Sequence, residues 1–147
     1  MPKNLADFQD LKYNKNNKFE ELKAFKKYRT DNPKATRADY QRAVEIKEAG
    51  IQGDIHIPPR EIPNIDTYEF DDYHANAYRK HNVTEQEARQ FVNNAEVSIT
   101  RWNGRFECFF SHDGATYVDL ENSTLGTAFK STQFDNKAKI IMGIKDE

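Results

Sequence analysis

Apolar and polar residues alternate with a period of two along residues 97–131, which is the pattern of half-buried β-strands. Short turn motifs interrupt the alternation at Asn103-Gly104, Asp113-Gly114 and Glu121-Asn122-Ser123. Asn-Gly is typical of a type I′ hairpin, because both central positions of that turn need a positive φ. The pattern predicts a four-stranded antiparallel meander, with strands at 97–102, 105–111, 115–120 and 124–131.

A helical period precedes these strands. Thr84 and Glu87 have the spacing of a capping box, and the apolar residues after them follow the i, i+3, i+4, i+7 spacing of a helix packed by one face: Ala88, Phe91, Val92 and Ala95. Another helix is expected from about Asp66 or Phe70 to Tyr78, with a turn at 79–82 after it. Residues 134–144 are expected to form a short helix or an extended closing segment.

Two more helices are predicted near the N-terminus. Residues 1–16 are polar and have no firm period, so we expect a loose arm there. Asn17, with Glu20 three residues later, has the spacing of a helix start, and this helix should stop at Pro33. A second helix should begin at Thr36, with Asp39 in the capping-box place and Gly50 after its end, and should pair with the first helix in an antiparallel way.

Three prolines within residues 55–63 exclude a helix there, because proline removes a backbone donor and pushes the preceding residue towards an extended conformation. We interpret this segment as a linker or strap, and we do not expect its lone His56 to have a functional role. The chain is therefore predicted to be α+β. A basic helical arm and Pro-rich strap would occupy residues 1–63, and helices packed on one face of the meander would occupy 64–147.

Charge is distributed unevenly along the chain, although the formal net charge is only −2. Residues 1–60 carry 13 Lys and Arg against 9 Asp and Glu, whereas residues 61–147 carry 9 against 15. The basic N-terminal part is thus the expected contact with phosphate or an acidic partner. Residues 1–7 lack the apolar stretch of a signal peptide, so none is expected, and the sequence contains no phosphate-cradling glycine loop or EF-hand motif. The single Cys108 excludes an internal disulfide and is interpreted as a buried hydrophobe.

His74, Arg79 and His81 are the sharpest candidates for chemistry. On a helix, residues seven apart share one face, so the two imidazoles would converge near the guanidinium. Metal-free cleavage of RNA needs a base, an acid and a cation near the phosphorus, and these side chains supply all three. By spacing alone, polar residues at a helix end are the favoured alternative. A zinc site is disfavoured because a third and a fourth ligand are missing.

The strands offer further candidates. Arg101 would bind phosphate or form a cross-strand ion pair with Glu107 or Asp119, and Trp102 would stack on a base or cover the hairpin end. Thr127 and Lys130 lie on opposite faces by parity, so at most one of them points at a given pocket. His112 sits in a turn and is interpreted as turn chemistry. The set of substrate-binding candidates is Arg101, Arg105, Trp102, Tyr117 and Lys130.

The stretch from His74 to Lys130 resembles a known family. The motifs are His-x4-Arg-x-His-Asn-Val-Thr-Glu from His74, Val-Ser-Ile-Thr-Arg-Trp-Asn-Gly-Arg-Phe-Glu from Val97, Ser-x-x-Gly-Ala-Thr-Tyr-Val-Asp from Ser111, and Thr-Ala-Phe-Lys from Thr127. They are similar to the phage-encoded branch of the barnase, EndoU, colicin D and RelE-like nucleases. Such domains are found at the C-terminus of phage minor head proteins of the Mu F type and in polymorphic toxins. Residues 18–63 look like the segment that precedes such domains in phage proteins.

The resemblance implies a ribonuclease that needs neither metal nor cofactor. His74 would be the general base or acid, His81 the second proton carrier, Arg79 or Arg101 the phosphate-binding cation and Thr127 a phosphate or hydroxyl ligand. The implied partners are RNA, with tRNA as one candidate, and an immunity protein. The implied location is the host cytoplasm, or the virion for a head-associated copy, and no membrane is expected.

Two other functions are weighed beside this one. The first is a non-enzymatic phage head- or portal-associated module, or a host-interaction module, with a degenerate nuclease-like fold, suggested by the separable arm and the acidic sheet domain. The second is ADP-ribosyl transfer, which also occurs in phage head proteins. Its Arg, Ser-Thr-Ser and Glu-x-Glu pattern is absent, because Glu85-Gln86-Glu87 lies on the capped helix.

Overall fold

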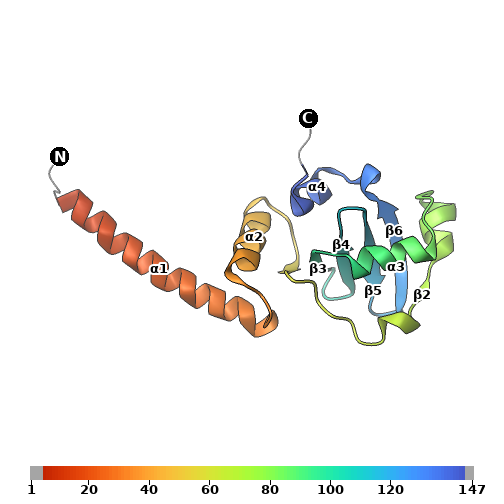
Figure 1. Cartoon of the computed structure of the whole chain (residues 1–147), viewed down its shortest axis with the longest axis horizontal. Helices are drawn as coiled ribbons and strands as arrows, with labels where there is room; N and C mark the ends of the chain where they lie inside the picture. Colours follow the sequence, from red (N-terminus) through yellow and green to blue (C-terminus); the bar gives the residue numbers. More distant parts are fainter. Residues whose placement is uncertain (1–4, 145–147) are drawn as a thin grey trace.

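The computed structural model describes residues 5–144, with side chains from residue 18 onwards, and has an α+β architecture (Figure 1). The helices are α1 (Leu5–Asp31), α2 (Arg37–Glu48), α3 (Glu85–Asn93) and α4 (Asn136–Met142). The strands are β1 (Asp54–His56), β2 (Glu69–Phe70), β3 (Val97–Arg101), β4 (Phe106–Phe110), β5 (Gly114–Asp119) and β6 (Thr124–Lys130).

The sheet has six strands in the order β1-β3-β4-β5-β6-β2. Strands β3 to β6 form the predicted antiparallel meander. The expectation of four strands is wrong, because β1 pairs antiparallel with β3 and β2 pairs parallel with β6 at the two edges. These strands have three and two residues, which is too short for an alternating pattern to appear in the sequence. The beginning of the Pro-rich strap therefore contributes to the sheet.

Local capping signals are confirmed in α2 and α3. In each helix the N-cap hydroxyl, of Thr36 or Thr84, accepts a hydrogen bond from the third helical residue, whose carboxylate accepts one from the N-cap backbone. The Asn103-Gly104 turn is also confirmed: φ is 57° and 86° at these residues, and Arg105 N donates to Trp102 O at 3.1 Å. These features depend on neighbours in sequence, so the sequence alone predicts them.

Helices cover both faces of the sheet, and not one face as predicted. Helix α3 lies across one face (Figure 1), where Phe91 packs with Phe109, Val118 and Leu125. On the other face α2 and α4 bury a second cluster, which includes Ile46, Ile99, Phe110 and Ile141. The second face is only partly covered at the β5 and β6 end, and the candidate site lies there.

Helix α1 differs most from the prediction. It begins at Leu5 and continues through Asn17, so the helix start at Asn17 is wrong and so is the loose arm over residues 5–16, while residues 1–4 of that prediction lie outside the described residues. Residues 5–31 contain neither Gly nor Pro, and nothing in the backbone interrupts the helix. Its C-terminal part packs against α2, through Phe25 and Tyr28 on Tyr40, while its N-terminal part extends away from the sheet (Figure 1).

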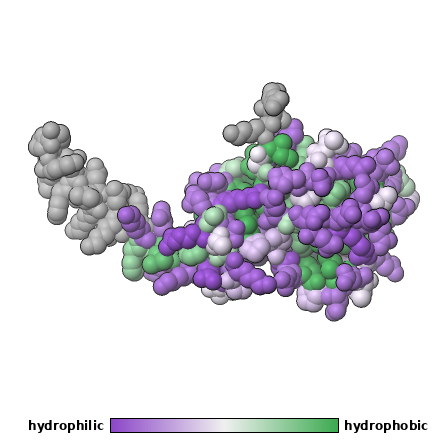
Figure 2. Space-filling model, viewed as in Figure 1, coloured by the Kyte–Doolittle hydropathy of each residue, from purple (hydrophilic) through white to green (hydrophobic). Residues whose placement is uncertain are grey.

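The surface is mainly polar. Figure 2 shows hydrophilic residues over most of the visible face, with apolar residues in small separate groups. Within residues 5–144, no helix is both long enough and apolar enough to cross a bilayer.

Candidate active site

A cleft of about 840 Å³ opens on the sheet face opposite α3. Seven of the nine residues singled out from the sequence line it: His74, Arg79, His81, Trp102, Arg105, Tyr117 and Thr127. They come from three parts of the chain, namely the segment 74–81, the β3–β4 hairpin tip, and strands β5 and β6. The tertiary fold thus brings the predicted histidine cluster to the strands.

The two histidines reach the cleft without sharing a helix face. A π-helical turn at Tyr73–Tyr78 ends before His81, and Lys80 and Asn82 have φ of 58° and 56°, so the predicted helical relationship is wrong. The chain reverses there, and His81 N donates to Ala75 O at 2.9 Å. The Asn76 amide holds the reversed segment through two hydrogen bonds with the Val83 backbone, at 2.7 and 2.8 Å. π-Helical turns are frequent at functional sites.

The His81 imidazole is half-buried and one of its nitrogens has no partner. Its ring lies 5.4 Å from the Phe129 ring, and Nδ1 is buried without a hydrogen bond. Burial lowers the pKa of His81, and a hydrogen bond with Gln133 opposes this only in part. Near pH 7 the ring is therefore mostly neutral, which leaves it able to accept a proton.

Thr127 presents a second buried polar atom without a partner. It lies on β6 directly opposite Tyr117, next to an irregularity in the β5–β6 pairing, and its Oγ1 makes no hydrogen bond. Burial raises the pKa of Tyr117 to about 12, so its phenol stays protonated. Buried polar atoms are almost always paired in folded proteins, so a hydroxyl left unpaired in a cleft is a feature to explain.

Arg105 is held by carboxylates, although it lines the cleft. Its guanidinium lies 3.1 Å from Asp119 Oδ2 and 3.6 Å from Glu121. Burial would raise the pKa of Asp119, but hydrogen bonds from Arg105 and Asn122 outweigh it and keep the pKa below its ordinary value. By contrast, Arg79 forms no ion pair with any described residue, and its guanidinium lies 5.1 Å from the Tyr78 ring. Arg79 is therefore the available cation.

The remaining two candidates lie outside the cleft. Arg101 extends over the Phe110 ring, at 5.8 Å, and lines a neighbouring hollow. Neither of its predicted cross-strand ion pairs forms, because Glu107 pairs with Arg60 and Asp119 with Arg105. Lys130 points to the α3 face, where its Nζ is 3.7 Å from Glu87. Thr127 and Lys130 are indeed on opposite faces, as parity predicted.

The cleft residues that sequence reasoning missed include Asp71, Gln133 and Asp135. The Asp71 carboxylate accepts a hydrogen bond from His74 N at 3.0 Å and so holds the start of the π-helical turn. Asp135 caps α4, which an Asp before an amphipathic segment could have indicated. Gln133 follows β6 in a short 3₁₀ turn, and no sequence pattern points to it.

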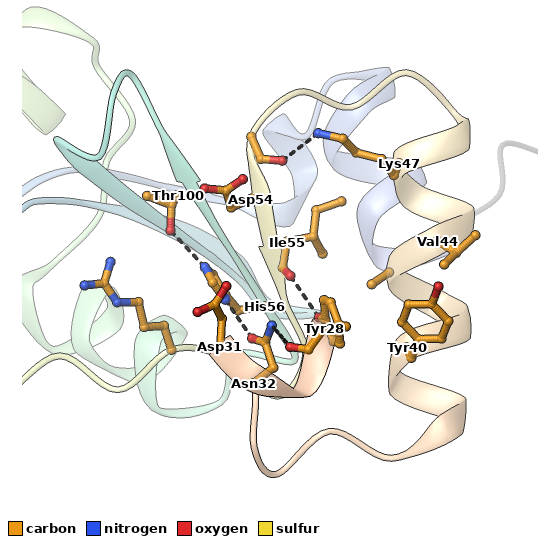
Figure 3. A pocket seen from close by; sticks show the side chains of 13 residues that line it. Tyr28, Asp31, Asn32, Tyr40, Val44, Lys47, Asp54, Ile55, His56 and Thr100 are labelled. Atoms are coloured by element: carbon orange, nitrogen blue, oxygen red, sulfur yellow. Dashed lines mark hydrogen bonds between the residues drawn. The ribbon is translucent and has the colours of Figure 1, made fainter. Parts of the chain in front are cut away.

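A second cavity, of about 570 Å³, lies between the end of α1, α2 and β1 (Figure 3). In it His56, which received little weight from the sequence, uses both ring nitrogens: Nδ1 is 2.7 Å from Asn32 Oδ1 and Nε2 is 3.0 Å from Thr100 Oγ1. The Thr100 hydroxyl donates to the fully buried Glu107 at 2.5 Å, and Arg60 donates to the same carboxylate. This network ties the arm to the sheet.

Neither Cys108 nor His112 belongs to the cleft. Burial raises the pKa of the Cys108 thiol to about 12, which confirms its role as a buried hydrophobe and not a nucleophile. His112 lies in the predicted turn, with its Nε2 2.9 Å from Glu96. Over the described part of the chain, no three His, Cys, Asp or Glu side chains are grouped as metal ligands.

Comparisons with protein families, with curated proteins and with solved structures found no match to this chain.

Proposed function

We propose that this protein is a metal-independent ribonuclease that cleaves RNA by attack of the 2′-hydroxyl on the adjacent phosphorus. One observation carries the proposal: His81 and Thr127, each of which has a buried polar atom without a partner, line the same cleft as His74 and the unpaired Arg79. Cleavage of a phosphodiester requires a proton acceptor, a hydrogen-bond donor and a cation near the phosphorus, and the residues around this cavity supply all three. The resemblance of residues 74–130 to phage-type nucleases supports the same reaction.

The roles of the residues follow from their environments. His81, with its lowered pKa, takes the proton of the 2′-hydroxyl, and the 2′-oxygen forms a bond to phosphorus. Arg79 and the Thr127 hydroxyl stabilise the negative charge that grows on the phosphoryl oxygens. His74 donates a proton to the 5′-oxygen as its bond to phosphorus breaks. The products are a 2′,3′-cyclic phosphate and a 5′-hydroxyl.

The charge of the cleft predicts how binding responds to salt. Arg79 is the one lining cation without a carboxylate partner among the described residues, since Asp119 and Glu121 hold Arg105. Each phosphate contact to a cation adds about 0.7 to the slope of log affinity against log salt for a single strand. Binding at the cleft alone should therefore depend weakly on salt, and aromatic contacts must contribute to it.

The test is incubation of the protein with total RNA or purified tRNA in EDTA. Cleavage by the wild type should leave cyclic phosphate ends, and His74→Ala and His81→Ala should each lower the rate by about 10²–10⁴-fold. His112→Ala is the matched control, because that imidazole is exposed and belongs to a turn outside the cleft. No cleavage by the wild type, or full activity of both cleft variants, would contradict the proposal.

One observation favours a second candidate, a docking module for phage head or portal proteins. Helix α1 extends away from the sheet, and it exposes 64% of Phe19 and 39% of Leu22 (Figure 1). Exposed aromatic and aliphatic side chains are typical of contact sites. Co-purification of the chain with a head or portal protein, lost on Phe19→Asp but not on His81→Ala, would support this candidate.

A further inference from the structure

The hollow that Arg101 lines has a volume of about 670 Å³ and adjoins the histidine cleft at the tip of the β3–β4 hairpin. Its lining includes Arg101, Asn103 and Lys137, and Trp102 lines both the hollow and the cleft. The two cavities are therefore neighbours that share the indole as a wall. A ligand longer than one nucleotide that occupies the cleft would have to pass this side chain to reach the hollow.

Trp102 is held in an unusual position. Its φ is 53°, in the left-handed region that bulky residues rarely adopt, and 57% of the residue is exposed. The ring packs edge-on against Phe106, at 5.1 Å, and lies at a tilt against Tyr117, at 6.2 Å. Strained backbone conformations concentrate at binding sites, and an exposed, supported indole is a platform on which a base stacks.

The hollow also has the charge that a phosphate needs. Arg101 and Lys137 line it, against the single carboxylate of Asp54. The cleft has the opposite balance, with Asp71, Asp119 and Asp135 against two arginines. The positive charge in which the cleft is poor is thus supplied by the hollow on the other side of the Trp102 indole.

We infer that the two cavities form one track for single-stranded RNA, which crosses Trp102. The scissile phosphate occupies the histidine cleft, a neighbouring base stacks on the indole, and the next phosphate binds Arg101 and Lys137. A-form duplex keeps its bases stacked and paired, so only an unpaired strand can place a base on this ring. The inference rests on the proposed ribonuclease function and assigns its substrate class.

Intrinsic fluorescence tests this track directly, because Trp102 is the only tryptophan of the chain. The ligands are 2′-O-methyl oligonucleotides, which lack the attacking hydroxyl. They are a dinucleotide, a single-stranded hexanucleotide and a duplex formed by two separate strands. The hexanucleotide should quench the emission and the duplex should not. Lys137→Glu should weaken hexanucleotide binding about tenfold and leave dinucleotide binding unchanged. Lys27→Glu on α1 makes the same charge change away from both cavities and is the control.

A further variant separates stacking from charge. Trp102→Asn suits the left-handed backbone, and it should weaken binding of a dye-labelled hexanucleotide, measured by anisotropy, without lowering the thermal midpoint. Cleavage that depends on His81 but proceeds equally on duplex, or hexanucleotide binding unaffected by Lys137→Glu, would overturn the track and leave the ribonuclease proposal intact. Quenching by the single strand without any cleavage of RNA would support the track and contradict the ribonuclease.

Discussion

His56 and His81 are both partly buried imidazoles next to the same sheet, and they differ in how far the fold satisfies them. Both ring nitrogens of His56 have partners, Asn32 and Thr100, whereas Nδ1 of His81 has none. The Asn32 amide is itself oriented by its bond to Tyr28 O. A histidine with complete hydrogen bonds stabilises the fold, whereas His81 lines the cleft and keeps a nitrogen whose hydrogen bonding the fold does not satisfy. The comparison separates a structural site from a candidate active site.

Alanine substitution of each histidine tests this distinction, because the two variants should lose different properties. His81→Ala should lower ribonuclease activity by about 10²–10⁴-fold and cost less stability than His56→Ala, because it removes the hydrogen bond with Gln133 and the Phe129 contact but no hydrogen bond of Nδ1. His56→Ala should lower the stability and leave ribonuclease activity nearly unchanged. Parallel cleavage assays and urea unfolding curves measure both quantities. Equal losses of activity in the two variants would remove the distinction.

The stability side of the comparison depends on Glu107. Its carboxylate is fully buried, and its Oε1 accepts from Thr100 and Arg60 while Oε2 has no partner, so Glu107→Ala removes the acceptor of the Thr100 hydroxyl and leaves a cavity behind. We expect a loss of about 2–4 kcal/mol in the free energy of unfolding. Chemical denaturation measures it. Glu121→Ala, at an exposed carboxylate, is the control and should cost less than about 0.5 kcal/mol.

For His56→Ala the expected loss is smaller, because the ring is only partly buried. Removing the imidazole leaves Asn32 Oδ1 and Thr100 with fewer partners, which should cost about 1–3 kcal/mol. Amide exchange should increase most where the network joins α1 to β1. Unchanged protection at residues 28–32 would show that the network does not hold the arm.

The pH dependence of stability and of the cleavage rate tests the role of His81. Its folded pKa is lowered, so the unfolded chain binds the proton more tightly. The stability contribution of the neutral ring is complete above the unfolded pKa of about 6.5 and is lost as pH falls through the folded pKa. The acidic limb of the pH–rate profile should likewise lie below about 6.5. His81→Gln should abolish the stability component, and a limb above that value would contradict the role as base.

The smallest effect is expected at Lys130. Its side chain makes an ion pair of 3.7 Å with Glu87 on the α3 face, with both groups partly exposed. Lys130→Ala should change stability by less than about 1 kcal/mol and leave cleavage unaffected. A clear loss of activity would mean that the α3 face also contacts RNA, contrary to the single track.

Much of the fold was predictable because its signals are local. The capping boxes at Thr36 and Thr84 and the Asn103-Gly104 turn depend on residues close in sequence. The meander follows from short turns that force neighbouring strands to pair. The edge strands β1 and β2 escaped prediction because their pairing is with strands far along the chain.

Residue type and spacing are enough to predict the α+β class, the four central strands and a histidine and arginine cluster at 74–81. Which of the candidate side chains lack a partner depends on how the distant segments pack. Asp119 and Glu121 hold Arg105, Arg101 lies beyond Trp102, and His81 Nδ1 and Thr127 Oγ1 are left without partners in one cleft. The physical reason is that residue type and spacing specify what a side chain can donate or accept. Whether a partner already meets it depends on contacts between distant parts of the chain.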